Sequence, residues 1–331
     1  MSKPALYISA ASTISNQPTF GNAGFSAALQ PVEASSALIS PDYKAYIDAG
    51  LLRRMSKILR MSVACAKDCV AQAGIEQPDA IVVGTGLGCL QDTEKFLNTS
   101  LTVEGLLPPT SFIQSTHNTM AGQISLSLGN HGYNMTHTQN TLSFEHALLD
   151  ASMLLREGDR NVLVGAADEH IDILDEITER LELRLDAWLD VRQEAGDDAS
   201  LTIEKSIPLT SGASFFILSQ ENAGNAAAEL ADVYTSGGAE YGQEEIDAFL
   251  DRNGLQISDI DLVLHTGVPV ASASRHANYL ALAGIYPTAS AFALHYAVDM
   301  LSANSEVRNV FICNTLRKSN LGLILLKAVE A

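Results

Sequence analysis

Four cysteines are the most reactive side chains in the sequence, and two of them are spaced as a pair. Cys65 and Cys69 lie four residues apart, which puts both on one face of a helix and could hold a metal ion. Cys89 and Cys313 are isolated, so no second pair follows. Most of the four cysteines also lie in strongly apolar surroundings. We therefore predict buried cysteines that act as small hydrophobic side chains in a reducing compartment.

Four histidines between residues 117 and 146 are a second group that could bind a metal: His117, His131, His137 and His146. Their spacings fit no standard zinc pattern, and no pair of carboxylates or thiolates accompanies them. We interpret them as loop and interface histidines and expect no metal site.

Three glycines, Gly84, Gly86 and Gly88, could form a phosphate-binding turn. The stretch lacks the last spacing of a dinucleotide fingerprint, and no P-loop lysine follows it. We therefore expect no nucleotide and no other cofactor.

The elements that would position these residues alternate between strands and helices. A helix is predicted over Arg54–Gly74, where apolar residues recur at helical spacing and a glycine ends the pattern. Short apolar runs rich in Val, Ile and Leu predict strands covered on both faces, and together with the helices they indicate a layered α/β fold. These runs are Leu6–Ala10, Ala80–Val83, Asn161–Gly165, Ser214–Leu218, Leu262–His265, Asn309–Cys313 and Gly322–Lys327.

The sequence also resembles itself. Phe144 begins a predicted helix that leads into RNVLV, and 148 residues later Phe292 begins another that leads into RNVFI. Similarly, PDAIVVGTG at 78–86 has a counterpart in DIDLVLHTG at 259–267. This repetition predicts two pseudo-symmetric half-domains, residues 1–220 with long insertions and a shorter half at 221–331.

Composition and charge restrict the possible partners. The chain has 331 residues, 47% of them apolar, and a formal net charge of −19, which disfavours nucleic acid and anionic membrane surfaces. About a third of the acidic residues lie between Asp168 and Glu204, in a stretch interpreted as a solvated helix or flap. No apolar run is long enough to span a bilayer, and the first residues lack the pattern of a secretion signal, so we expect a cytoplasmic protein.

Several motifs together resemble the β-ketoacyl-acyl carrier protein synthases. They are RRM at 53–55, VVGTGLG at 82–88, PTSFIQSTHNTMAGQISLSLG at 109–129, TLSFEHALLDASMLLREGDRNVLVGAADE at 141–169 and the closing NVFICN. The resemblance spans nearly the whole chain and implies a thiolase-like fold with α/β/α/β/α layers. In this family a cysteine at a strand-to-helix turn accepts the acyl chain, and two histidines polarise the malonyl thioester.

The position that matches the family's nucleophile is Thr141, and no cysteine occurs between His117 and Glu169. A threonine hydroxyl is a poor nucleophile without a base to take its proton, so we interpret Thr141 as a structural turn residue. Ser143 is expected to cap the helix that starts at Phe144.

The two histidine positions differ. His265 in LVLHTG matches the family's first histidine, whereas Ile285 in GIYPTASAF occupies the place of the second. His295, ten residues later, is expected to face elsewhere. The family's lysine has no counterpart between His276 and Gly284, and NTLRKSN replaces the gating loop. The resemblance therefore implies that no catalytic residue set is complete.

A ketosynthase fold without its nucleophile resembles a chain length factor, the degenerate subunit that pairs with an active ketosynthase and shapes the acyl tunnel. The motifs are most similar to subunits of aryl polyene, flexirubin and dialkylresorcinol pathways. The partner would then be a catalytic ketosynthase. The acyl carrier protein would be bound through that partner, because carriers are acidic and this chain is too; Arg53, Arg54 and Lys57 are its tightest basic group in the N-terminal half.

The resemblance implies that the partner faces Phe112–Met120 and Asn134–Ser143. The residues expected in this interface are Phe112, Ser115, His117, Asn118, Met120, Asn134, Thr136, Gln139 and Asn140. Two alternatives remain open: a stand-alone acyltransferase or decarboxylase that uses Thr141 or Ser143 with His265, and a scaffold whose interior never meets the chain.

Overall fold

The strands of the first half form one side of a mixed sheet. A computed structural model describes residues 5–107, 109–180, 207–222, 224, 226–237, 242–267, 275–317 and 319–329. Its first five strands are β1 (Leu6–Ile14), β2 (Ala80–Gly84), β3 (Tyr133–His137), β4 (Asn161–Asp168) and β5 (Gly212–Ser219). They lie in the order β3-β2-β4-β5-β1. Strand β2 pairs parallel with β3 and β4, whereas β5 pairs antiparallel with β4 and β1.

The second half repeats this topology strand by strand. Its strands are β6 (Ala228–Gly237), β7 (Leu262–His265), β8 (His276–Asn278), β9 (Asn309–Asn314) and β10 (Asn320–Lys327). They lie in the order β8-β7-β9-β10-β6, with the same alternation of parallel and antiparallel pairs. The halves join where Leu6–Ile8 of β1 pairs with Ala228–Leu230 of β6. We keep residue 220, between β5 and β6, as the proposed boundary.

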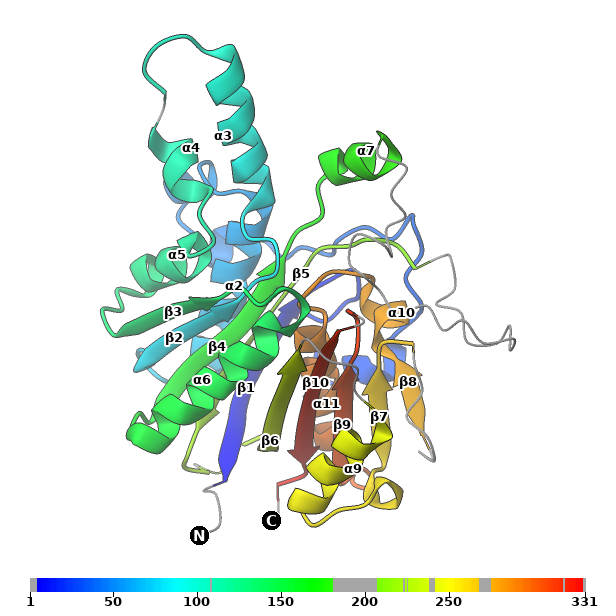
Figure 1. Cartoon of the computed structure of the whole chain (residues 1–331). Helices are drawn as coiled ribbons and strands as arrows, with labels where there is room; N and C mark the ends of the chain where they lie inside the picture. Colours follow the sequence, from blue (N-terminus) through cyan, green and yellow to red (C-terminus); the bar gives the residue numbers. More distant parts are fainter. Residues whose placement is uncertain are drawn as a thin grey trace.

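Helices form three layers around the strands, as Figure 1 shows. The central layer is α6 (Ser143–Glu157) with α11 (Ser290–Ala303), which share one apolar core with strands of both halves. On the outer face of the first half, α2 (Lys57–Ala73) and α5 (Thr119–Leu128) bury a second core. On the outer face of the second half, α9 (Gln243–Arg252) buries a third. This is the predicted α/β/α/β/α thiolase-like architecture.

The predicted helix over residues 54–74 is confirmed as α2. It ends at Gly74, whose φ of 66° is left-handed and suits glycine. Cys65 and Cys69 are fully buried on its inner face, where their thiols donate to the carbonyl oxygens of Ala213 and Phe215. The four cysteines are buried, as predicted, and form no disulfide with one another.

Three strands were not predicted from the sequence, namely β3, β6 and β8. Strands β3 and β8 are the short, partly exposed edges of the sheet, so they lack the apolar runs of covered strands. Strand β6 alternates between buried and half-exposed residues over much of its length. Of the acidic stretch after Asp168, α7 (Asp172–Arg180) is helical, and residues 181–204 lie outside the described part of the chain.

The remaining elements are short or stand apart from the layers. Helices α3 (Leu90–Thr102) and α4 (Pro109–Gln114) project together from the end of the sheet, with Phe96 and Phe112 in contact at a ring distance of 5.4 Å (Figure 1). Helix α1 spans Ala49–Leu52, α10 spans Tyr279–Ala283, and four 3₁₀ helices cover Phe25–Ala28, Tyr43–Ala45, Asn140–Leu142 and Ile257–Asp259. No helix in the described ranges is long and apolar enough to cross a membrane.

Candidate functional site

The turn that precedes α6 is packed tightly against the carboxyl end of β2. A short 3₁₀ helix spans Asn140–Leu142, and Asn140 has a φ of 54°, which side-chain-bearing residues adopt rarely. A Cβ added to Gly84, the last residue of β2, would lie 2.6 Å from the carbonyl oxygen of Ser143. Only glycine fits there, so the turn is held in one position against the sheet.

Thr141 lies inside this turn and is fully buried. Its hydroxyl oxygen accepts a hydrogen bond from the Asn320 side-chain amide at 2.9 Å, and its carbonyl oxygen accepts one from Asn314 Nδ2 at 2.8 Å. Among the described residues, no histidine, lysine or carboxylate makes a hydrogen bond with this hydroxyl. Nothing in that part of the chain could therefore take its proton.

Ser143 does not cap the helix, so that prediction is wrong. Helix α6 begins at Ser143 itself, and Leu142 occupies the cap position without a side-chain bond. The Ser143 hydroxyl instead lies near the carbonyl oxygens of Thr85 and Asn140, at 2.9 and 2.7 Å. This ties the start of α6 to the end of β2 and leaves the hydroxyl occupied.

A buried carboxyl group lies one turn into α6 and was not foreseen. Glu145 is fully buried, and its Oε1 accepts a hydrogen bond from Asn314 Nδ2 at 2.7 Å. Burial raises the pKa of Glu145 to about 7, while the Asn314 amide opposes the shift. Asn314 Nδ2 thus donates to both the Thr141 carbonyl oxygen and the Glu145 carboxyl group. An isolated Glu in a helical pattern gives no sequence signal of burial, since most helical glutamates face water.

His265 stands at the carboxyl end of β7, where β7 pairs with β9 and His265 lies opposite Cys313. Its Nδ1 accepts a hydrogen bond from the backbone N–H of Gly267 at 3.0 Å, so the ring proton belongs on Nε2. Burial, followed by the nearby His276, lowers the pKa of His265 to about 4. The imidazole is therefore neutral at pH 7, and its buried Nε2 has no partner among the described residues.

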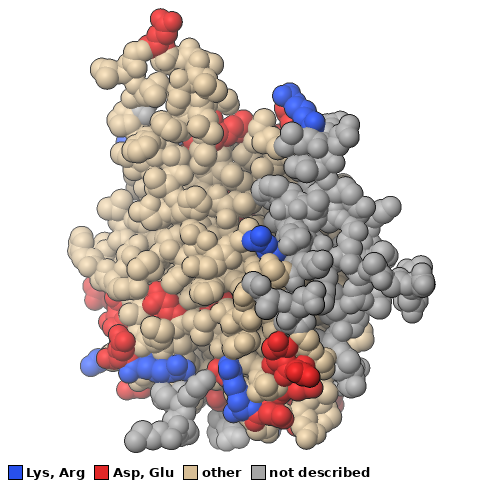
Figure 2. All heavy atoms as spheres, viewed as in Figure 1, with Lys and Arg blue, Asp and Glu red and all other residues tan. Residues whose placement is uncertain are grey.

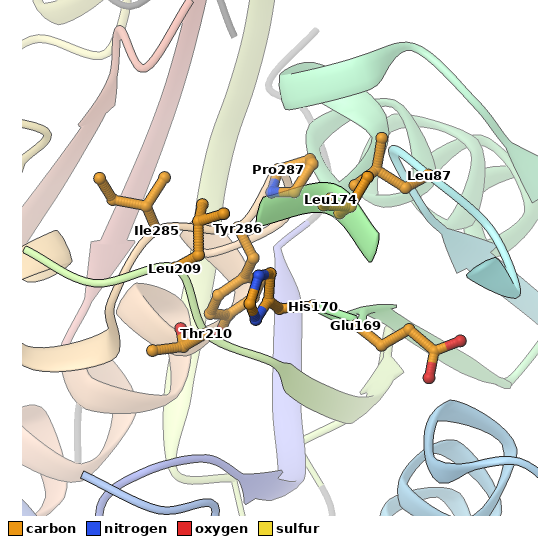
Figure 3. A pocket seen from close by; sticks show the side chains of 9 residues that line it. All are labelled: Leu87, Glu169, His170, Leu174, Leu209, Thr210, Ile285, Tyr286 and Pro287. Atoms are coloured by element: carbon orange, nitrogen blue, oxygen red, sulfur yellow. The ribbon is translucent and has the colours of Figure 1, made fainter. Parts of the chain in front are cut away.

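Ile285 lines a small cavity, shown in Figure 3, beside Leu209. The cavity has about 10 Å³ of room for water centres, which is barely enough for one water molecule. His170, Glu169 and Tyr286 also line it, and Figure 3 shows the Glu169 carboxylate pointing away from Ile285. At the position predicted for the family's second histidine, Ile285 thus contributes an aliphatic side chain to a small cavity of mixed lining.

His295 faces elsewhere, as expected. Its Nδ1 lies 2.8 Å from the hydroxyl of Thr13 on β1, and its ring contacts Phe25 and Phe216 edge-on. Burial lowers the pKa of His295 to about 4. This imidazole is a core residue of the central layer.

Asp168 joins the two halves at the end of β4. Its buried carboxylate accepts hydrogen bonds from the Thr85 hydroxyl at 3.0 Å and from the backbone N–H groups of Gly86 and Leu87. From the second half, the hydroxyl and the N–H of Thr288 donate to it at 2.8 and 3.2 Å. The glycine stretch 84–88 is thus bound to a carboxylate of the chain itself, which argues against its use as a phosphate cradle.

The predicted partner surface surrounds the exposed edge strand β3. Most of the nine residues expected there are accessible: Phe112, His117, Asn118, Asn134 and Gln139 are exposed, and Ser115, Thr136 and Asn140 are half-buried. Met120 must be corrected, because it is fully buried between α5 and the core under α2. A methionine on the inner face of an amphipathic helix packs inward regardless of its exposed neighbours.

Large apolar side chains are exposed around the same edge. On α3, α4 and the segment between them these are Leu97, Leu101, Val103, Leu106, Phe112 and Ile113; on α5 and β3 they are Leu126, Tyr133 and Met135. Figure 2 shows this end of the molecule largely without charge, although the chain carries a net charge of −19. Exposed apolar side chains gathered on one part of a surface are typical of interaction sites.

The clustered histidines do not form a metal site within the described ranges, where no group of three ligand-type side chains converges. His137 Nε2 instead contacts Asp150 Oδ2 at 2.8 Å, and the His146 ring stacks on His137 at 6.4 Å. This network joins edge strand β3 to α6, so these two histidines lie beside the predicted partner surface.

Comparisons with known proteins agree with this geometry. Residues 31–211 match the family described as "Beta-ketoacyl synthase, N-terminal domain". No curated protein matches the chain.

Solved structures share the fold along nearly the whole chain. The ishigamide ketosynthase/chain length factor is 17% identical with a TM-score of 0.76, covering 98% of this chain and 100% of that one. A β-ketoacyl synthase from Burkholderia phymatum is 12% identical at 0.74, covering 99% and 100%. The ketosynthase ApeO in complex with its chain length factor ApeC from Xenorhabdus doucetiae is 13% identical at 0.73, covering 98% of each.

Proposed function

The chain belongs to the β-ketoacyl synthase family, and we propose that it is a non-elongating subunit of the chain-length-factor type that pairs with a catalytic ketosynthase. The observation that carries the proposal is the state of Thr141. A hydroxyl at the nucleophile position is buried, accepts a hydrogen bond from Asn320, and has no base beside it in the described chain. Acyl transfer to such a group is strongly disfavoured.

The second requirement of condensation is unmet as well. Decarboxylation of a malonyl thioester builds negative charge on an enolate oxygen, which preorganised donors must stabilise. His265 Nε2 is one such donor, but Ile285 has no hydrogen to donate. One donor without the second, and without a thiolate, does not complete the family's chemistry.

The surface around β3 supports pairing with a ketosynthase. An edge strand presents unpaired backbone groups, and exposed apolar side chains flank this one on α3, α4 and α5. The similar ishigamide structure is a ketosynthase/chain length factor, and ApeO is in complex with its chain length factor ApeC. An acidic chain would leave docking of the acidic acyl carrier protein to its partner.

One observation favours a second candidate, a stand-alone decarboxylase or acyltransferase. The unpartnered Nε2–H of His265 would be free to polarise a thioester carbonyl. Thr141 and Ser143, the nucleophiles that this alternative requires, have hydroxyls engaged by Asn320 and by two carbonyl groups. We therefore rank it second. A scaffold whose interior never meets the acyl chain is a third reading.

We also propose an aryl polyene-like pathway and the cytoplasm as its setting. The pathway is suggested by the motifs SFEHALLDA and STHN. The compartment is suggested by four buried thiols that form no disulfide with one another, which suits a reducing environment.

The test is co-expression with a ketosynthase encoded beside this chain, followed by intact-mass measurement of acyl groups on each subunit. We expect a stable heterodimer in which acyl label appears on the ketosynthase alone. Acyl label on this chain, or decarboxylation of malonyl-carrier by this chain alone, would establish the second candidate instead. Changed product length after mutation of interior side chains would exclude the plain scaffold.

A further inference from the structure

A hollow of about 500 Å³ lies between the start of α2 and the projecting helices α3 and α4, away from the Thr141 turn. Its volume is within the range of small-molecule sites. Four cations line it, Arg53, Arg54, Arg60 and Lys95, against one carboxylate, Asp92. This is a local excess of positive charge in a chain whose net charge is −19.

In the described part of the chain these four cations have no ion-pair partner. Within the described ranges, no carboxylate oxygen lies within 4.0 Å of the charged groups of Arg53, Arg54, Arg60 or Lys95. Lys57, which the sequence groups with Arg53 and Arg54, is directed elsewhere: its Nζ donates to the carbonyl oxygen of His170 at 2.8 Å. Like charges around one hollow repel each other, so the folded chain tolerates a cost that an anion would relieve.

Buried polar groups inside the hollow also lack partners. Ser56 is 8% exposed and Asp92 5% exposed, yet Ser56 Oγ and Asp92 Oδ2 make no hydrogen bond. The Arg60 Nε is buried and unpartnered too. Burial raises the pKa of the Asp92 carboxyl, and the adjacent Ser56 hydroxyl lowers it. Buried polar groups are almost always satisfied, so this set indicates a place where another molecule supplies the missing bonds.

We propose that this hollow binds a small phosphate monoester that also carries a hydroxyl group. The phosphate oxygens accept hydrogen bonds from Arg60, Ser56 and the cations at the rim. The ligand's hydroxyl donates to Asp92 Oδ2, which a ligand with acceptors alone would leave unsatisfied. Guanidinium forks suit phosphate oxygens because they can donate two parallel hydrogen bonds. The site goes beyond the chain-length role and lies away from the Thr141 turn, but it borders the proposed partner surface, because Gln114 lines the hollow and belongs to the stretch Phe112–Met120.

The test is calorimetric titration of the full chain with inorganic phosphate and with glycerol 1-phosphate, at constant ionic strength. We expect saturable binding of one equivalent, tighter for the ester. Arg60→Gln and Lys95→Gln should each weaken it by about tenfold or more, which corresponds to about 1.4 kcal/mol. The exposed Arg156→Gln on α6 removes the same charge outside the hollow and should leave binding unchanged.

Three results would overturn the proposal: no saturable heat with either probe, undiminished binding by both hollow variants, or an equal loss in Arg156→Gln. If Arg60→Gln fails to fold, as circular dichroism would reveal, Lys95→Gln decides the question, because Lys95 is an exposed residue of α3. Asp92→Asn separates the two probes, since it should weaken the ester more than inorganic phosphate.

Discussion

The side-chain nitrogen of Asn320 lies 2.9 Å from the hydroxyl oxygen of Thr141 and donates a hydrogen bond to it. The two residues are 179 positions apart and belong to different halves of the chain. At the predicted nucleophile position, the threonine hydroxyl thus accepts a hydrogen bond that links the two halves. This bond helps to hold the turn in place, and it makes the site open to several tests.

Restoring the thiol alone should not restore reactivity. In Thr141→Cys the new side chain stays buried, and burial disfavours the thiolate, as it does for Cys65 and Cys89, whose pKa values it raises. We expect alkylation by iodoacetamide at pH 7.5 to be at least about 100-fold slower than that of a free thiol. Mass spectrometry measures this against a low background, because the four native thiols are buried.

The same variant, unfolded in guanidinium, is the control and should be alkylated at all five thiols. Rapid labelling of residue 141 in the folded Thr141→Cys variant would contradict the interpretation that this turn is unreactive. Acyl transfer to residue 141 from an acyl carrier would contradict it as well.

Asn314 is expected to be among the most sensitive polar positions of the chain. Asn314→Ala leaves the Thr141 carbonyl and Glu145 Oε1 without their buried donor. We expect a loss of about 2–5 kcal/mol in the free energy of unfolding, since unsatisfied buried groups lose their full desolvation penalty. Urea denaturation measures this. Asn98→Ala on the exposed face of α3 is the matched control and should change stability by less than about 0.5 kcal/mol.

The buried carboxyl of Glu145 predicts a pH-dependent effect. Its pKa rises from 4.5 to about 7 on folding, so the stability it contributes is complete below about pH 4.5 and is lost as the pH rises through 7. Glu145→Gln keeps an acceptor for Asn314 and cannot ionise. We therefore expect the variant to exceed the wild type in unfolding free energy at pH 8 by up to about 3 kcal/mol.

At pH 5 this advantage should fall to below about 1 kcal/mol, because the folded carboxyl is then protonated. Denaturation of both proteins at the two pH values measures the difference, and other titrating groups cancel because both proteins share them. A difference that does not change with pH would show that Glu145 ionises normally in the folded chain.

The apolar surface around β3 predicts a loss of partner binding on introduction of charge. Phe112 is 57% exposed on α4, so Phe112→Asp should leave the isolated chain folded while weakening association with the ketosynthase by about 100-fold or more. Surface plasmon resonance with the purified partner measures this. Ile39→Asp, at 46% exposure outside this surface, is the control and should bind as the wild type does. Equal losses in the two variants would place the interface elsewhere.

Covered strands such as β4 were predictable from the sequence because a strand buried on both faces consists of a continuous apolar run. Helix α2 was predictable for a different reason, since its apolar residues recur at helical spacing. Strand β3 was missed for the opposite reason: as an edge it buries none of its residues fully in the single chain. Met120 was misplaced because its exposed sequence neighbours belong to the turn before α5, whereas its own side chain points into the core.

The sequence by itself determined the layered α/β class, the internal duplication and the absence of a cysteine at the turn, because these depend on residue types and on their period along the chain. The tertiary structure alone decided what the turn is bonded to. Asn314 and Asn320 bond to Thr141 from more than 170 residues away, and Lys95 comes to the same hollow as Arg53 and Arg54 from another helix; no local pattern encodes these meetings. Hydrogen bonding and burial are properties of assembled neighbours, so they become visible only after the two halves have packed together.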